Sequence, residues 1–174
     1  RWWIEEFKDD NVGLIIKVNT KNNSTMDSIV TESFLESIVK QYPDKKCKIY
    51  MLHGDLTSGQ MTGLYNHPKV KALVNIAHGE GFGLPMFEAA RESLPIVTIG
   101  WSGHMDFLVD NEKEYFQKVD YTLRPIQEHA VWDGVLRKDS LWAYATETSY
   151  KETLRRTMDN WNECKKTAEE LSVI

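Results

Sequence analysis

The sequence predicts an α/β fold with an open, mainly parallel sheet and helices on both faces. Apolar runs typical of strands alternate with amphipathic segments about four times, at a spacing of roughly 20–25 residues. The chain has 174 residues, of which 41% are hydrophobic, so it can bury the core of one domain. No linker or internal repeat divides the sequence, and we therefore expect a single domain over residues 1–174.

In the first part of the chain, two strands and two helices are expected. The apolar runs that predict buried strands are 11–20 and 46–54. Between them, residues 28–42 carry apolar side chains at the spacing of one helix face, and Pro43 ends this helix. The residues of that face are Ile29, Val30, Phe34, Leu35, Ile38 and Val39. A short helix capped by Thr57 or Ser58 should follow the second strand.

The remaining elements continue the alternation. Residues 70–77 and 95–100 predict two further buried strands, and 84–94 predicts a helix with Pro85 at its first position. The elements expected after these are a short helix within 102–110, an edge strand within 114–126 that leads into irregular chain, and a long amphipathic helix over 149–171.

Composition excludes several classes of protein. The net charge of −5 gives no reason to expect a nucleic-acid partner, and no apolar stretch is long enough to span a membrane. The start of the chain lacks the apolar segment of a signal peptide. Cys47 and Cys164 lie far apart and are expected to be reduced thiols, so we expect a cytoplasmic protein.

The stretch HGEGFGLPMFEAA, residues 78–90, is the candidate site. It follows a predicted strand and opens a predicted helix, at the sheet edge where α/β proteins bind ligands. Its glycines let the backbone approach a ligand, and the N–H groups at the start of the helix favour a phosphate. Glu80 and Glu88 only accept hydrogen bonds, so two of them suit a ligand with sugar diols on both sides of a phosphate. A purely structural alternative is a common glycine loop followed by a first-turn glutamate that interacts with the helix dipole.

Residues 80–108, EGFGLPMFEAARESLPIVTIGWSGHMDFL, resemble the signature of glycosyltransferases of the GT-B fold, in particular the retaining family four of group 1. The resemblance is dense over residues 73–110 and thinner over 12–72. It implies a Rossmann-like domain, the C-terminal, donor-binding half of a GT-B enzyme. The N-terminal acceptor domain would then be absent from this chain, and the fragment alone would be inactive. Trp2 and Trp3 could pack against that missing half or in the core of this one.

The resemblance also implies roles for particular residues. Glu88 would bind the donor ribose, and Glu80 would contact the hexose as a catalytic residue. The residues whose backbone would line the sugar and diphosphate are Gly81, Phe82, Gly83 and Leu84. Lys17, with Lys21 as second candidate, would neutralise the departing diphosphate, although the usual Gly-Arg and Lys-Gly patterns are missing and Lys17 could equally be a solvated strand-end lysine.

Further candidates line the same predicted edge. His53 ends a predicted strand, and Ser102 and Gly103 stand where the family has Gly-Gly, with Asp106 in place of its usual Glu. His78 and His104 flank the two turns. No histidine shows metal-ligand spacing and no Asp-x-Asp motif is present, so we expect neither a metal nor a cofactor.

The predicted activity is transfer of a hexosyl group from a nucleoside-diphosphate sugar to an unknown acceptor, without metal and, by the resemblance, with retention of configuration. An alternative is a degenerate module that binds a nucleotide sugar without catalysis. A third reading, another GT-B class such as an epimerase or a phosphorylase, lacks the histidine and arginine signatures expected of such epimerases.

Overall fold

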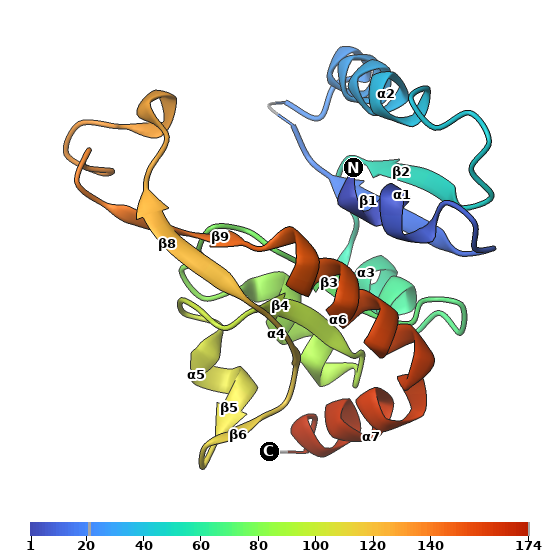
Figure 1. The fold of residues 1–174 in the computed structure, drawn as a ribbon, viewed down its shortest axis with the longest axis vertical. Helices are drawn as coiled ribbons and strands as arrows, with labels where there is room; N and C mark the ends of the chain where they lie inside the picture. Colours follow the sequence, from blue (N-terminus) through green and yellow to red (C-terminus); the bar gives the residue numbers. More distant parts are fainter. Residues whose placement is uncertain (21, 174) are drawn as a thin grey trace. The chain divides into compact units, whose positions relative to one another are not determined.

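Parallel strands followed by helices build the protein, which confirms the predicted α/β class. The computed structural model describes residues 1–20 and 22–173 (Figure 1). Backbone contacts divide the chain into two compact units, residues 1–60 and 61–174, and each is described by itself. The expectation of one domain stays a prediction.

In the first unit, the described residues before α3 (Ser58–Tyr65) form two parallel strands and two helices. Strand β1 (Gly13–Val18) pairs in register with β2 (Lys48–His53), from Gly13 opposite Lys48 to Val18 opposite His53. Helix α1 (Trp2–Phe7) buries Trp3, which packs on the Phe7 ring with 5.1 Å between centroids. Trp3 therefore has the core role that the sequence left open.

Helix α2 (Thr25–Val39) forms where its apolar spacing predicts, but it buries no residue within its unit. Its start is a capping box in which Ser24 and Asp27 bond each other's backbone N–H groups. Three side chains of its apolar face are exposed, with Ile29 at 51%, Val30 at 65% and Phe34 at 65% of full exposure, whereas Leu35, Ile38 and Val39 are half-buried. Periodicity thus predicted the helix correctly.

The second unit is built on a sheet of three parallel strands in the order β3–β4–β7. They are β3 (Leu73–Asn75), β4 (Ile96–Ile99) and β7 (Gln117–Val119). Only β4 is buried along its whole length, because it alone has a strand on each side. The predicted strands 11–20, 46–54 and 70–77 form, but β1, β2 and β3 are only partly buried.

Helices pack beside this sheet. Helix α3 (Ser58–Tyr65) begins after Thr57, whose hydroxyl accepts from the Gln60 N–H, as expected of a cap. Helix α4 (Leu84–Arg91) follows β3, and the short α5 (Met105–Leu108) follows β4. Met86 and Leu108 from these helices are fully buried in the core of the unit.

The predicted long C-terminal helix is in fact two helices, α6 (Glu147–Asp159) and α7 (Trp161–Leu171). Asn160 separates them with φ −113° and ψ 34°, and its side-chain amide donates to the Arg156 carbonyl. Asparagine readily takes such local bonds in place of helical ones.

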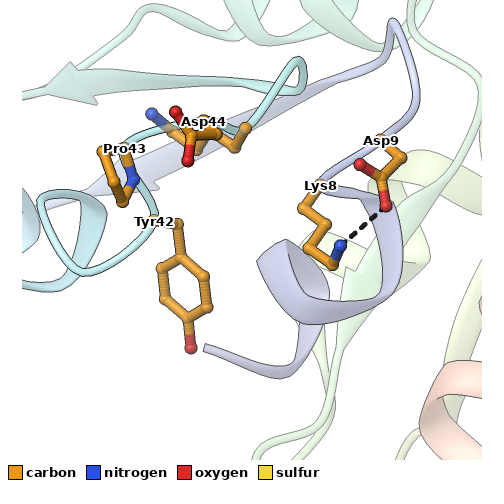
Figure 2. Close-up of a pocket in the computed structure, with 6 residues that line it drawn as sticks. Lys8, Asp9, Tyr42, Pro43 and Asp44 are labelled. Carbon is orange, nitrogen blue, oxygen red and sulfur yellow. Dashed lines mark hydrogen bonds and ion pairs between the residues drawn. The ribbon is translucent and has the colours of Figure 1, made fainter.

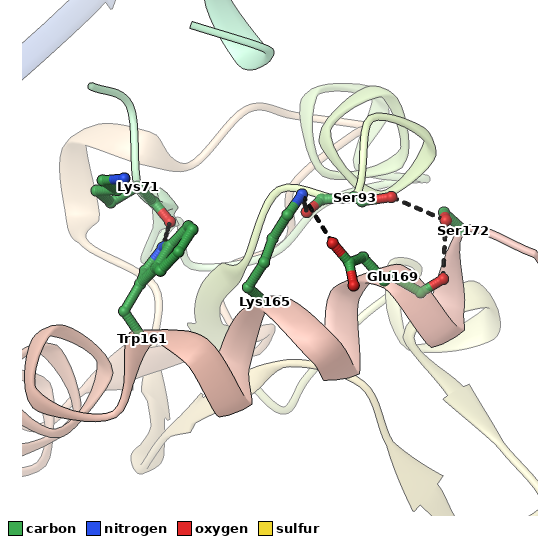
Figure 3. A network of polar contacts seen from close by, with 6 residues as sticks. All are labelled: Lys71, Ser93, Trp161, Lys165, Glu169 and Ser172. Carbon is green, nitrogen blue, oxygen red and sulfur yellow. Dashed lines mark hydrogen bonds and ion pairs between the residues drawn. The ribbon is translucent and has the colours of Figure 1, made fainter. Parts of the chain in front are cut away.

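Helix α7 and the residue after it form hydrogen bonds with the loop before β3 and the loop after α4 (Figure 3). Trp161 Nε1 donates to the Lys71 carbonyl at 2.9 Å, and the Lys71 ammonium lies 4.1 Å from the centre of the Trp161 ring. Lys165 Nζ donates to the Ser93 carbonyl at 2.8 Å, and the hydroxyl of Ser93 donates to that of Ser172.

Two antiparallel ribbons were not predicted. Strands β5 (Val109–Asp110) and β6 (Lys113–Glu114) form a small one. Strands β8 (Tyr121–Pro125) and β9 (Leu141–Ala145) form a longer one, with the 3-10 turn η1 (Glu128–Ala130) in its connecting segment (Figure 1). The edge strand expected within 114–126 forms as two strands, β7 and β8, whereas β9 lies where the sequence suggested irregular chain.

Candidate functional site

The glycine turn, defined here as residues 76–83, lies where the sequence predicts, between β3 and α4. Strands β3 and β4 are parallel neighbours, so their carboxyl ends meet at one edge of the sheet. The segment 100–104 leaves β4 at that edge and contacts the glycine turn. The two segments together form the candidate site.

The contact between the two segments requires glycine. A Cβ atom on Gly103 would lie 1.9 Å from the carbonyl oxygen of Gly81, and the Gly103 N–H donates to the Glu80 carbonyl at 3.1 Å. Gly83 has φ +87°, and a Cβ on it would meet His104 at 2.9 Å. These glycines let the two backbones touch.

Ser102 forms two hydrogen bonds with the backbone of the glycine turn. Its hydroxyl donates to the Glu80 carbonyl at 2.6 Å and accepts from the Glu80 N–H at 3.0 Å. Ser102 holds φ +89°, a strained conformation for a residue with a side chain. Its visible role is to fix the backbone of the turn.

Four consecutive backbone N–H groups of the turn are unpaired. Within the described residues, no hydrogen bond is made by the N–H groups of Gly81, Phe82, Gly83 or Leu84. The first paired amides of α4 are those of Met86 and Phe87, which donate to the Gly83 carbonyl. The start of α4 therefore presents free donors and the positive end of a helix dipole.

Glu80 is held by a residue that sequence reasoning missed. Asn75, the last residue of β3, donates from Nδ2 to Oε1 of Glu80 at 2.9 Å. Its own Oδ1 accepts from the Ala77 N–H at 2.8 Å, which fixes the amide. A polar residue at the end of an apolar strand was the available signal.

Glu88 lies in the second turn of α4. The helix begins at Leu84 after Gly83, so Pro85 is its second residue, and the first-turn placement expected for Glu88 was wrong. Oε2 of Glu88 accepts from the Tyr65 hydroxyl at 3.4 Å. Burial and the adjacent carboxylate raise the pKa of Tyr65 to about 12.

Neither glutamate is neutralised by a cation. In the part of the chain that the structure describes, Glu80 and Glu88 form no ion pair with a lysine or arginine. Both carboxylates keep unused acceptor capacity.

An aromatic cluster flanks the turn. Phe82, Phe87 and Phe107 contact one another with ring centroids 5.2–5.3 Å apart. Phe82 is 49% exposed, so one apolar surface of this cluster faces solvent beside the free N–H groups.

The two histidines near the turn differ. His104 is buried, and its Nε2 donates to the Ile99 carbonyl at 2.8 Å, while Nδ1 has no partner among the described residues. His78 is half-buried and bonds the backbone of Ala143 in β9. Asp106 lies exposed in the first turn of α5 and does not cap that helix, since the cap position is His104.

The remaining candidates belong to the first unit. Lys17 Nζ donates to the Gly54 carbonyl at 2.6 Å and to the side chain of Asn19. His53 Nε2 lies 3.1 Å from the Thr20 hydroxyl. Lys21 lies outside the described residues. Lys17 is thus engaged in its own unit, and its role at a diphosphate stays a prediction.

One pocket in the first unit, of about 200 Å³, is shown in Figure 2. The residues that line it are Lys8, Asp9, Tyr42, Pro43, Asp44 and Lys45. Lys8 pairs with Asp9 at 2.8 Å, and the pocket contains none of the residues that the sequence suggested for a site.

Cys47 and Cys164 form no disulfide, as expected from the sequence, and both are buried. Among residues 1–20 and 22–173, no group of three His, Cys, Asp or Glu side chains could hold a metal ion. No helix in those same ranges is long and apolar enough to cross a membrane.

No family model and no curated protein match the chain. Among solved structures, it is similar to the catalytic domain of starch synthase IV from Arabidopsis thaliana bound to ADP and acarbose, with 11% identity and a TM-score of 0.48. The match covers 99% of this chain and 37% of that one, so the chain spans little more than a third of the solved protein.

Proposed function

We propose that this chain is the nucleotide-sugar-binding part of a GT-B glycosyltransferase of group 1, resembling the retaining family four. The observation that carries the proposal is the run of unpaired N–H groups from Gly81 to Leu84, beside a carboxylate that Asn75 holds in place. A diphosphate would supply acceptors for those donors, and a sugar would supply hydroxyl donors for that acid.

The two glutamates fit the two ends of such a ligand. Glu88 would accept from the hydroxyls of the donor ribose, and Glu80 from the hydroxyls of a hexose. Each keeps free lone pairs beyond its single bond to Tyr65 or Asn75. This assignment rests on the resemblance in residues 80–108 together with these contacts.

The mechanism follows from charge. Breaking the bond between sugar and phosphate leaves negative charge on the diphosphate and gives the sugar oxocarbenium character. Fixed N–H donors at the diphosphate would stabilise this transition state more than the ground state. Transfer without metal, retention of configuration and a separate acceptor domain are part of the proposal.

The setting that we propose is the cytoplasm, where the two buried thiols of Cys47 and Cys164 would stay reduced. The acceptor would be bound outside this chain, which alone would be inactive.

One observation favours a second candidate, a module that binds a nucleotide sugar without catalysis. The Lys17 ammonium, the best candidate for neutralising a leaving diphosphate, already bonds Gly54 and Asn19. Nucleotide binding by the chain together with no transfer in the presence of an acceptor-binding domain would favour this candidate.

Calorimetric titration with ADP, UDP and GDP and with their hexose conjugates tests the proposal. We expect saturable binding by at least one pair. Glu88→Gln should weaken it about tenfold, because a charge-assisted hydrogen bond to the ribose is lost. Glu163→Gln, which changes an exposed carboxylate of α7, is the matched control. Absence of binding by every nucleotide would contradict the proposal.

A further inference from the structure

His78, at the start of the glycine turn, is fixed by the β8–β9 ribbon. Its Nδ1 lies 2.9 Å from the Ala143 carbonyl oxygen, and the Ala143 N–H donates back to the His78 carbonyl at 3.2 Å. The imidazole stacks on Trp142 with 5.0 Å between centroids and 14° between planes, and it contacts Tyr144 at 4.3 Å. The ring therefore has little freedom to rotate.

These contacts also determine the tautomer. A carbonyl oxygen only accepts hydrogen bonds, so Nδ1 must carry the proton. In the neutral ring Nε2 then has a lone pair and is an acceptor. Within the described residues Nε2 has no hydrogen-bond partner, and the side chain is only half-buried. The ribbon thus presents one oriented acceptor.

Side chains of the β8–β9 ribbon keep the His78 imidazole in this orientation. Trp142 and Tyr144 are two residues apart in β9, so both rings lie on one face of the ribbon. Arg124, on β8 opposite Trp142, places its guanidinium 4.3 Å from the centre of the Tyr144 ring. A cation–π contact from Arg124 therefore stabilises the Tyr144 ring, which contacts His78.

We propose that Nε2 of His78 accepts a hydrogen bond from a hydroxyl of the donor sugar, which makes His78 a sugar-binding residue and the β8–β9 ribbon part of the donor site. This inference rests on the proposed function above. His78 precedes Glu80 by two residues on the same turn, and a sugar is a ligand rich in hydroxyl donors. A neutral acceptor and an acidic one, two residues apart on the same turn, would recognise two different hydroxyls of one ring.

The substitution His78→Asn tests the role of Nε2 separately from that of Nδ1. The asparagine amide can replace the Nδ1–H donor to Ala143, whereas nothing in it replaces Nε2. Binding is measured by calorimetry with ADP, UDP and GDP and with ADP-glucose, UDP-glucose and GDP-mannose. We expect an unchanged affinity for the diphosphate and a loss of about 3- to 15-fold for its sugar conjugate. His67→Asn, at an exposed histidine of the same unit, should change neither affinity.

Equal losses for diphosphate and conjugate, or no loss for either, would overturn the inference while leaving the proposed function intact. If the unchanged chain binds no diphosphate, the proposed function itself fails, and the inference fails with it.

Nitrogen NMR of the imidazole gives a second readout that does not depend on the variant. At a pH at which the imidazole is neutral, Nε2 of His78 in the free protein should have the chemical shift of an unprotonated nitrogen. The sugar conjugate should move this shift, and the diphosphate alone should not. A protonated Nε2 in the neutral ring, or an identical response to both ligands, would contradict the proposal.

Discussion

The side-chain amide of Asn75 donates to Oε1 of Glu80 at 2.9 Å, and this bond orients an acid of the glycine turn from the end of a strand. The strand is part of the sheet, so the direction of the Glu80 side chain is set by the rigid part of the unit. A loop residue alone would not be fixed in this way.

Asn75→Ala should therefore weaken sugar recognition more than diphosphate binding. The variant leaves Glu80 in place and lets its side chain rotate, so we expect affinity for a nucleotide sugar to fall about tenfold. Affinity for the diphosphate should fall less than threefold. Calorimetry with both ligands measures the difference, and an equal fall for both would mean that Asn75 acts on the whole turn.

Gly103→Ala should destabilise the second unit by about 2–4 kcal/mol. The new Cβ would lie 1.9 Å from the Gly81 carbonyl oxygen, and backbone atoms cannot move away without separating the two segments. Urea unfolding measures the change. Gly63→Ala in α3 is the matched control, because nothing lies within 4 Å of its added methyl group, and it should stabilise by about 0.5–1 kcal/mol.

Two substitutions at Ser102 separate strain from hydrogen bonding. Both Ser102→Ala and Ser102→Gly remove the hydroxyl that bonds Glu80, but only glycine relieves the positive φ of +89°. The glycine variant should therefore be the more stable of the two by about 1 kcal/mol in urea unfolding. The opposite order would show that the conformation at Ser102 carries no strain.

Tyr65 should make stability depend on alkaline pH. Its pKa is about 12 in the folded protein against an ordinary value of 10.0, so the folded state keeps a proton that the unfolded chain loses. The stabilisation that Tyr65 gives the folded state is fully present below pH 10. It is lost as pH rises toward 12, which lowers the free energy of unfolding by an amount on the order of 2 kcal/mol. Tyr65→Phe should flatten this part of the stability curve. The pKa of Tyr150 is also raised to about 12, so some dependence should remain in the variant.

Phe34→Ser should cost less than about 0.5 kcal/mol, because the side chain is 65% exposed on α2. Phe116→Ser, at a position only 5% exposed, should cost several times more. Thermal unfolding of both variants checks the contrast. A large loss for Phe34→Ser would indicate that this face of α2 is covered in solution.

Sequence reasoning placed the glycine turn, the helix that follows it and the buried strand at 96–99, because glycine content and apolar runs are local signals. It could not find Asn75 or Tyr65 as partners of the two glutamates, since those bonds depend on tertiary geometry. It predicted a strand that includes β8 but not β9 or the pairing of the two, because strand pairing depends on tertiary geometry. Periodicity predicted the helix α2, but it does not show what covers the apolar face, and no residue of α2 is fully buried.

The bond between His78 and Ala143 closes a segment of 65 residues. A ribosome makes the chain from the amino end, so the glycine turn emerges long before the strand that orients its histidine. Until residue 143 has left the exit tunnel, the nascent chain contains the glutamates and the free N–H groups of the glycine turn. It still lacks the hydrogen bond to Ala143 that orients the His78 imidazole. The order of synthesis therefore delays completion of the site until the ribbon has folded back.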